Sequence, residues 1–123
     1  MITPTKTILV VDDEGAQRLL VRRILEAEGY EVREAAHGAV AIAALEAGAP
    51  CDLLIVDVRM PAISGDEVAD RIRRTRPDVK VLYIAANIAT LLGRRALLPG
   101  EAHLDKPFTR DELLAATAAL LRR

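Results

Sequence analysis

The chain has 123 residues, of which 51% are hydrophobic, and its 17 lysines and arginines nearly balance its 18 aspartates and glutamates. This length fits one compact domain with a buried core, and a net charge of −1 offers no basic surface that would attract nucleic acid or anionic lipid. No apolar run approaches the ~20 residues of a membrane span and residues 1–6 lack a signal-peptide core, so we expect a cytoplasmic protein without nucleic-acid or membrane partners.

Short β-branched apolar runs alternate with longer amphipathic segments, which is typical of strand and helix units around a parallel sheet. The first two predicted strands are Thr7–Val11 and Glu31–Ala35, and predicted helices follow them over 15–28 and 39–47. The first helix carries apolar residues at helical spacing: Leu20, Val21, Ile24, Leu25 and Ala27. The run over 53–58 is the most continuous apolar stretch, which indicates a central strand covered on both faces.

The second half continues the alternation. The predicted elements are a helix over 65–74, a strand over 79–85, a helix over 88–98, a short strand at 103–104 and a helix over 110–123. Gly93 interrupts the helix over 88–98, so we expect that helix to be short or labile. The last helix should turn Leu113, Leu114, Thr117 and Leu120 toward the sheet.

These elements predict an α/β fold with a doubly wound, five-stranded parallel sheet in the order 2-1-3-4-5 and five helices. We expect one domain over residues 1–123 with its core from about residue 6 to about residue 121. The only cysteine, Cys51, stands beside an apolar run, which favours a buried or half-buried thiol over a disulfide or metal site.

Charged residues stand at the carboxyl ends of three predicted strands. Asp12 and Asp13 follow the first strand, Asp57 closes the third, and Lys106 follows the fifth. Because such ends meet where the strand order reverses, these side chains should share one crevice. Three carboxylates there would repel one another, which favours a hard divalent cation such as Mg²⁺ or Mn²⁺. Such a site can neutralise a phosphoryl group and leave one carboxylate as the nucleophile.

A plainer explanation is that acidic residues after strands form turns or cap helices, for which aspartate is well suited. This explanation suffices for Asp13 alone. It does not explain why a lysine followed by a proline, Lys106-Pro107, stands at the end of another strand. The joint arrangement therefore favours a functional site.

The sequence resembles response-regulator receiver domains of bacterial two-component systems over essentially its whole length. The matching segments are ILVVDDE at 8–14, EGYEV at 28–32, LLIVDVRMP at 53–61 with Ser64 and Gly65, and DKPFT at 105–109. Their order and spacing together are specific to this CheY-like, flavodoxin-like family. The stretches VLY at 81–83 and LLPG at 97–100 are similar to receivers attached to hybrid histidine kinases.

The resemblance implies a role for each charged residue. Asp57 would be the phosphoacceptor, Asp13 and Asp57 would bind Mg²⁺ directly, and Asp12 would help to position the cation through water. Arg59 would contribute its backbone carbonyl to the metal, and Lys106 would contact the phosphoryl group. The peptide bond between residues 106 and 107 is expected to be cis, as bonds before proline allow at modest cost.

The function implied is acceptance of a phosphoryl group from a histidine kinase or a histidine phosphotransfer protein in a phosphorelay, by a stand-alone domain with no output domain. The chain would be no enzyme toward separate substrates, because it would catalyse only its own phosphorylation and dephosphorylation. Aspartyl phosphatases share a carboxylate nucleophile and Mg²⁺, but they require an acidic residue two positions after the nucleophile, and Arg59 stands there.

Two positions depart from the family pattern. Receivers normally place Thr or Ser at the end of the fourth strand and an aromatic residue in the fifth, and this chain has Ala85 and His103. Alanine offers no hydrogen-bond donor to a phosphoryl oxygen, which favours weakened or rewired switching. An alternative function is therefore a pseudo-receiver that binds partners independently of phosphorylation. Arg59 and Asn87 occupy positions that tune acyl-phosphate hydrolysis in this family.

Surface features suggest partner contacts of two kinds. The apolar residues of the first helix can extend into a docking patch for a kinase or phosphotransfer protein, and the fourth helix, fifth strand and last helix can pair two copies. The arginine pairs at 22–23, 73–74, 94–95 and 122–123 are expected to be ordinary solvated surface, and His37 is expected to face solvent.

Overall fold

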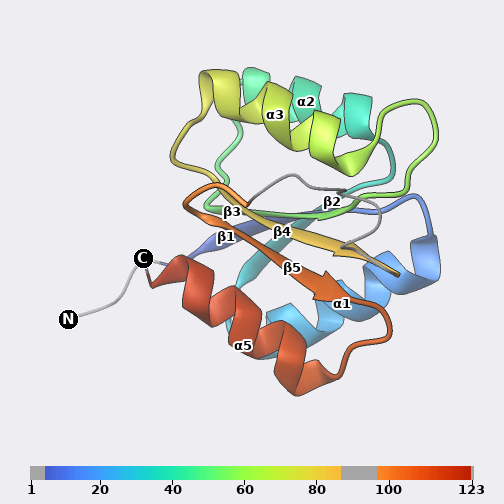
Figure 1. Ribbon diagram of the computed structural model, residues 1–123. Helices are drawn as coiled ribbons and strands as arrows, with labels where there is room; N and C mark the ends of the chain where they lie inside the picture. The colour runs from blue at the N-terminus through green and yellow to red at the C-terminus, as the bar shows by residue number, and fades with distance from the viewer. Residues whose placement is uncertain (1–4, 87–96, 123) are drawn as a thin grey trace.

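The computed structural model describes residues 5–86 and 97–122 and shows a parallel sheet between two layers of helices (Figure 1). The elements in chain order are β1 (Thr7–Val11), α1 (Gly15–Ala27), β2 (Glu31–Ala35), α2 (Gly38–Glu46), β3 (Leu53–Asp57), α3 (Gly65–Thr75), β4 (Lys80–Ala85), β5 (Glu101–Asp105) and α5 (Arg110–Leu121). The five parallel strands lie in the order β2-β1-β3-β4-β5, which confirms the predicted doubly wound α/β fold.

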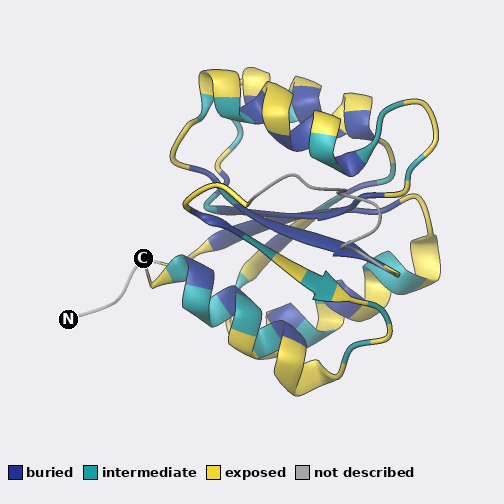
Figure 2. Ribbon diagram, viewed as in Figure 1, coloured by how far each residue is buried: buried dark blue, intermediate teal, exposed yellow. Residues whose placement is uncertain are grey.

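The sheet separates two apolar cores. Helices α2 and α3 cover one face and α1 and α5 cover the other, and the dark blue strands between them in Figure 2 are buried on both sides. Successive residues of β3 alternate between the faces, so Leu54 and Val56 pack under α2 and α3 while Leu53 and Ile55 pack over α1 and α5. Burial on both faces explains the uninterrupted apolar run of this strand.

The fifth strand is longer than the two residues predicted from the sequence. It runs from Glu101 to Asp105 and pairs with β4 from Val81↔Glu101 to Ala85↔Asp105. The segment EAHLD contains no β-branched residue, so its extended conformation comes from the ladder with β4 and not from local propensity. The helix predicted over 88–98 lies outside the described residues up to residue 96, as do Asn87 and the arginine pair at 94–95.

The buried face of α1 differs from its apolar pattern, whereas that of α5 follows the pattern. In α1, Val21 and Leu25 face the sheet, whereas Leu20 is 53% exposed and Ala27 is also exposed. In α5, Leu113, Thr117 and Leu120 are buried as predicted, and Leu114 is partly buried against the same core. Within the described ranges, no helix combines the length and apolar character needed to cross a bilayer.

Because the strands are parallel, their carboxyl ends lie along one edge of the sheet, where the loops after β1, β3 and β5 begin. The loop after β3 returns tightly: the Gly65 N–H donates to the Val58 carbonyl at 2.9 Å. A Cβ at Gly65 would overlap the Asp57 carbonyl oxygen, a contact that real Cβ atoms do not make. The first residue of α3 therefore has to be glycine if β3 is to end in its observed position.

Replacement of Gly65 by alanine should lower the free energy of unfolding by about 1 to 3 kcal/mol, because the added methyl forces β3 and α3 apart. Urea denaturation of Gly65→Ala measures this loss. The matched control is Gly15→Ala, also at the first residue of a helix, where the added Cβ meets only the flexible Arg18 side chain at 3.8 Å. Equal stability of the two variants would contradict the interpretation that only glycine fits at the start of α3.

Candidate functional site

Asp57 and Lys106 form a direct ion pair at the carboxyl edge of the sheet. The Lys106 Nζ atom donates to Asp57 Oδ2 at 2.6 Å, across 49 positions of sequence. The other carboxylate oxygen, Oδ1, accepts the Arg59 backbone N–H at 2.8 Å. The Asp57 side chain is only 8% exposed and that of Lys106 is 25% exposed, so the pair is partly shielded from water. One oxygen of Asp57 is held by backbone while the other faces an ammonium.

Asp12 brings a second buried carboxylate to the same ammonium. Its Oδ2 atom lies 4.0 Å from Lys106 Nζ, and its Oδ1 atom accepts the Glu14 backbone N–H at 2.9 Å. Burial raises the pKa of the Asp12 carboxyl, and the charges of Asp57 and Asp13 add to the increase, whereas the Glu14 N–H and Lys106 oppose it. A single ammonium does not fully compensate the negative charge that gathers here.

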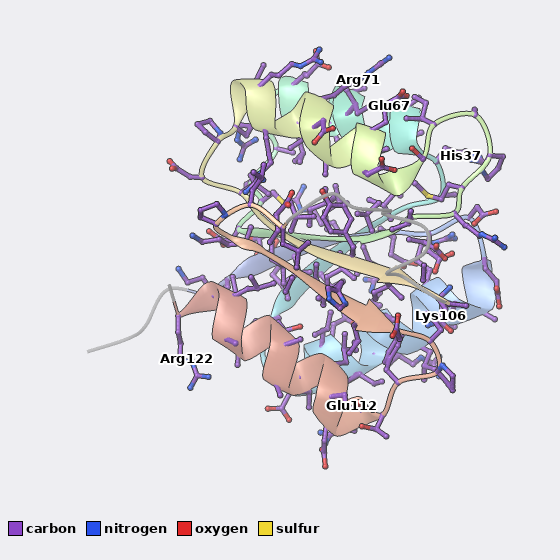
Figure 3. The ribbon with its side chains drawn as sticks, viewed as in Figure 1. His37, Glu67, Arg71, Lys106, Glu112 and Arg122 are labelled. Atoms are coloured by element: carbon purple, nitrogen blue, oxygen red, sulfur yellow. The ribbon has the colours of Figure 1, made fainter. Side chains whose placement is uncertain are left out.

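Burial and the neighbouring charges also act on the pKa of Lys106, each with the opposite sign to its effect on Asp12. Burial alone would lower the pKa of the Lys106 ammonium, but the hydrogen bond and charge of Asp57, with the charges of Asp12 and Glu14, outweigh burial and raise it. Lys106 therefore remains a fixed positive charge at neutral pH. Figure 3 shows its side chain beyond the end of β5, on the side of the sheet where α1 begins.

The donor set at this edge suits Mg²⁺ without forming a protein cage. Asp12 and Asp57 are buried, and Asp13 is exposed beside them. Among the described residues, no group of three or more His, Cys, Asp and Glu side chains converges closely enough to hold a metal ion. Mg²⁺ usually takes one or two carboxylates and retains several waters, so this group of three neighbouring aspartates with excess negative charge fits the cation.

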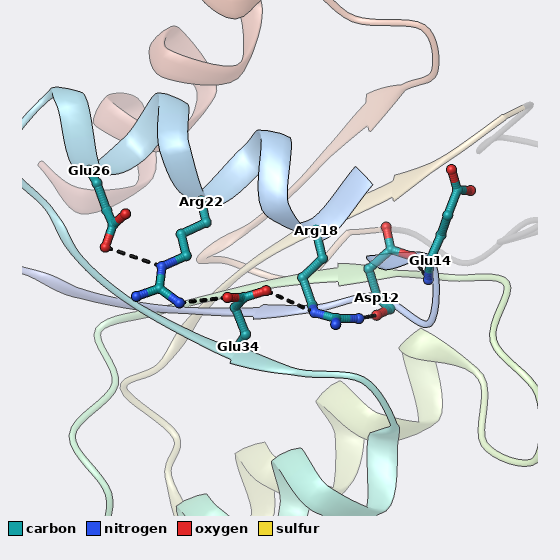
Figure 4. A network of polar contacts seen from close by, with 6 residues as sticks. All are labelled: Asp12, Glu14, Arg18, Arg22, Glu26 and Glu34. Carbon is teal, nitrogen blue, oxygen red and sulfur yellow. Dashed lines mark hydrogen bonds and ion pairs between the residues drawn. The ribbon is translucent and has the colours of Figure 1, made fainter. Parts of the chain in front are cut away.

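A network of arginine and glutamate side chains that the sequence did not predict fixes the backbone of Asp12 (Figure 4). The Arg18 guanidinium donates to the Asp12 carbonyl at 2.6 Å and to Glu34 Oε1 at 2.9 Å, and Arg22 donates to Glu34 Oε2 at 2.6 Å. The hydrogen bond from Arg22 lowers the pKa of Glu34, and Arg18 adds to the effect. Arg22 lies at the surface as expected, with its side chain 39% exposed, and it pairs there with Glu34 and Glu26. Its spacing of four residues from Glu26 was the available signal.

The two atypical positions lie in different environments. Ala85, at the end of β4, is buried, and its carbonyl accepts the Lys106 backbone N–H at 3.1 Å. His103 is exposed on β5, the edge strand, and His37 is exposed before α2.

The Lys106-Pro107 bond is cis, as expected, and Cys51 is buried with its pKa raised to about 11, mainly by burial.

An apolar hollow opens beside the ion pair. It has a volume of about 490 Å³ and is lined by Gln17, Leu20, Ala86, Lys106, Pro107 and Phe108. The exposed Leu20 of α1 forms part of its wall, which accounts for an apolar residue on the outward side of that helix. The hollow gives a partner an apolar surface to contact next to Lys106.

Comparisons with known proteins agree on one family. A family model described as "Response regulator receiver domain" matches residues 8–118. The transcriptional regulatory protein TcrA of Mycobacterium tuberculosis is 43% identical over 118 residues, which cover 94% of this chain but only 46% of TcrA.

Two crystal structures are similar along nearly all of both chains. A response regulator receiver protein from Sinorhizobium medicae has a TM-score of 0.83 at 32% identity, covering 96% of this chain and 95% of the other. The receiver domain of the hybrid histidine kinase CckA has a TM-score of 0.78 at 35% identity, covering 94% and 98%.

Removal of the Asp12 charge should stabilise the metal-free protein. A carboxyl whose pKa is raised by folding contributes stability below its unfolded pKa and loses it as pH rises through the folded pKa. We therefore expect Asp12→Asn to raise the free energy of unfolding by about 1 kcal/mol at pH 7, with a gain that shrinks near about pH 3.5.

Urea denaturation in chelator-containing buffer at both pH values measures this difference. Asp111→Asn, whose carboxylate is 93% exposed, is the matched control and should show no such gain. A gain that is absent at pH 7, or equal at both pH values, would contradict the charge-excess interpretation.

Proposed function

The chain belongs to the response regulator receiver family, and on this basis we propose that it accepts a phosphoryl group from a phosphohistidine onto Asp57, as the phosphoacceptor of a two-component phosphorelay. The observation that carries the proposal is the partly buried Asp57–Lys106 ion pair with Asp12 beside it at the carboxyl edge of the sheet. A carboxylate nucleophile and a fixed cation are the protein groups that phosphoryl transfer requires.

The backbone and the lysine prepare the carboxylate for attack. The Arg59 N–H holds Oδ1, so Oδ2 is the oxygen presented toward Lys106. When Oδ2 bonds to phosphorus, the bond from phosphorus to the histidine nitrogen breaks and its electron pair leaves with that nitrogen. Lys106, released from its contact with Oδ2, remains close enough to donate to a phosphoryl oxygen. The product is a mixed anhydride on Asp57, which later loses its phosphoryl group to water.

The resident cation of this proposal is Mg²⁺, or Mn²⁺ in its place. Asp13 and Asp57 would bind it directly, Asp12 would position it through water, and the Arg59 carbonyl would complete the protein ligands. When bound, such a cation neutralises charge that develops on the transferring phosphoryl group. The excess negative charge around Asp12 is the feature of the described residues that supports its binding.

A histidine kinase or a histidine phosphotransfer protein is the proposed partner. The phosphohistidine must approach Asp57 at the edge of the sheet, and the apolar hollow lined by Leu20 and Phe108 adjoins that approach. We propose this hollow as the docking patch that the apolar residues of α1 suggested. The chain spans about half the length of the curated relatives it matches, and the regulation of transcription named for TcrA is a property of that protein.

A second candidate is a binding module that acts without phosphorylation. Ala85 favours it, because the buried end of β4 then lacks a side-chain donor for a phosphoryl oxygen. The two candidates differ in what phosphorylation changes: it alters partner affinity in the phosphorelay candidate, and it leaves partner affinity unchanged in the binding module.

Incubation of the chain with acetyl phosphate and Mg²⁺ should add one phosphoryl group, detected by intact mass. Asp57→Asn should abolish the addition because the amide is not a nucleophile, and a chelator should abolish it in the unchanged chain. Asp52→Asn should be labelled normally, because this carboxylate lies at the amino ends of β1 and β3, away from Asp57.

Labelling that persists in Asp57→Asn would contradict the assignment of the acceptor. The absence of labelling in the unchanged chain would favour the binding module.

A further inference from the structure

The Arg18 guanidinium links the first turn of α1 to the loop that carries two of the proposed metal-binding aspartates. Its Nη1 atom donates to the Asp12 carbonyl at 2.6 Å, and its Nε atom donates to Glu34 Oε1 at 2.9 Å (Figure 4). The Arg18 backbone N–H donates to the Glu14 carbonyl at 3.0 Å, which begins the helix. One residue therefore joins the start of α1, the end of β1 and strand β2.

Glu34 orients this guanidinium from the neighbouring strand. It pairs in register with Val10, which precedes Asp12 by two residues. Its other carboxylate oxygen accepts Arg22 Nη1 at 2.6 Å, and the hydrogen bonds from Arg22 and Arg18 lower the pKa of Glu34, so this carboxylate is ionised at neutral pH. A planar guanidinium held by a carboxylate through one nitrogen presents its other nitrogens in fixed directions.

The Asp12 carbonyl belongs to the peptide unit that joins Asp12 to Asp13. Because a peptide unit is planar, a hydrogen bond that holds this carbonyl also fixes the path by which the chain continues into Asp13. The Asp12 N–H donates to the Ala35 carbonyl at 3.2 Å, and Asp12 Oδ1 accepts the Glu14 N–H at 2.9 Å. Arg18 therefore adds a further constraint on the two aspartates, and it acts through their backbone.

We propose that Arg18 is a positioning residue for the divalent cation: by holding the Asp12 carbonyl, it orients Asp12 and Asp13 and so determines how tightly Mg²⁺ binds. This inference rests on the proposed function, which assigns Mg²⁺ to these aspartates. Its sign is opposite to that of a simple charge effect. A guanidinium near the site repels a cation, so loss of its charge alone would tighten Mg²⁺ binding, whereas loss of its hydrogen bond should weaken it.

Titration of the full 123-residue chain with Mg²⁺, followed by amide chemical shifts, measures the dissociation constant. Arg18→Met should raise this constant about tenfold, as is typical when a group that orients a metal ligand is removed. An unchanged or lower constant in this variant would overturn the proposal.

Arg18→Lys decides the question if Arg18→Met does not fold. It keeps the charge but replaces the planar guanidinium, which bonds Asp12 and Glu34 together, by a single ammonium. The dissociation constant should therefore rise in this variant also. An unchanged constant would then overturn the proposal.

Arg22→Met is the matched control. Among the described residues, the Arg22 guanidinium donates to Glu34 and Glu26. The variant removes the same charge from the same helix and leaves the hydrogen bond from Arg18 to Asp12 in place, so its Mg²⁺ dissociation constant should not rise. A rise equal to that in Arg18→Met would overturn the proposal, because the network as a whole would then be responsible.

Labelling by acetyl phosphate separates positioning from damage to the reacting groups. In Arg18→Met, the Mg²⁺ concentration that gives half of the maximal rate should rise, and the rate at saturating Mg²⁺ should be retained because Asp57 and Lys106 are unchanged. A lower saturating rate with an unchanged half-saturating concentration would overturn the proposal.

Hydrogen exchange in chelator tests the positioning without the cation. The Glu14 amide, which donates to Asp12 Oδ1, should exchange faster in Arg18→Met than in Arg22→Met. Equal rates in the two variants would overturn the positioning role. Absence of Mg²⁺ binding and of labelling in the unchanged chain would instead count against the proposed function, and the exchange rates would still decide whether Arg18 holds the loop.

Discussion

The contact on which the rest of the structure depends is the ion pair between Asp57 and Lys106. A buried carboxylate and an ammonium are both costly to remove from water, and each is tolerated here because the other lies within hydrogen-bond distance. The two residues are 49 positions apart, and only the parallel order β1-β3-β4-β5 brings the ends of their strands to one edge. The topology therefore serves to place one charge opposite another.

The surrounding residues preserve this placement while leaving the local charge unbalanced. Gly65 lets α3 start against the Asp57 carbonyl, and Arg18 holds the carbonyl of Asp12 from the other side. Neither contact neutralises the carboxylate of Asp12. The edge of the sheet therefore carries excess negative charge, which a divalent cation can neutralise. Farther from the edge, Tyr83 of β4 and Arg73 of α3 both donate to Glu101, which holds β5 against them.

The sequence predicted the parts of the structure that follow from pattern. The apolar run ending in Asp57 predicted a central strand, and the rule that strand ends converge predicted that Lys106 lies near it. The full length of β5 could not be predicted, because EAHLD is extended only through pairing with β4. The ion pair between Arg73 and Glu101 could not be predicted either. Arg73 was expected to be solvated surface, but its side chain is only 15% exposed because α3 packs it against Glu101.

A double-mutant cycle on Asp57 and Lys106 tests the central claim most directly. Urea denaturation of Asp57→Asn, Lys106→Met and the double variant isolates the interaction between the two side chains from the cost of each substitution. The account predicts a favourable coupling of about 1 to 3 kcal/mol, with the double variant less destabilised than the sum of the single variants. Effects that simply add would show that the two groups do not interact, and would contradict the account.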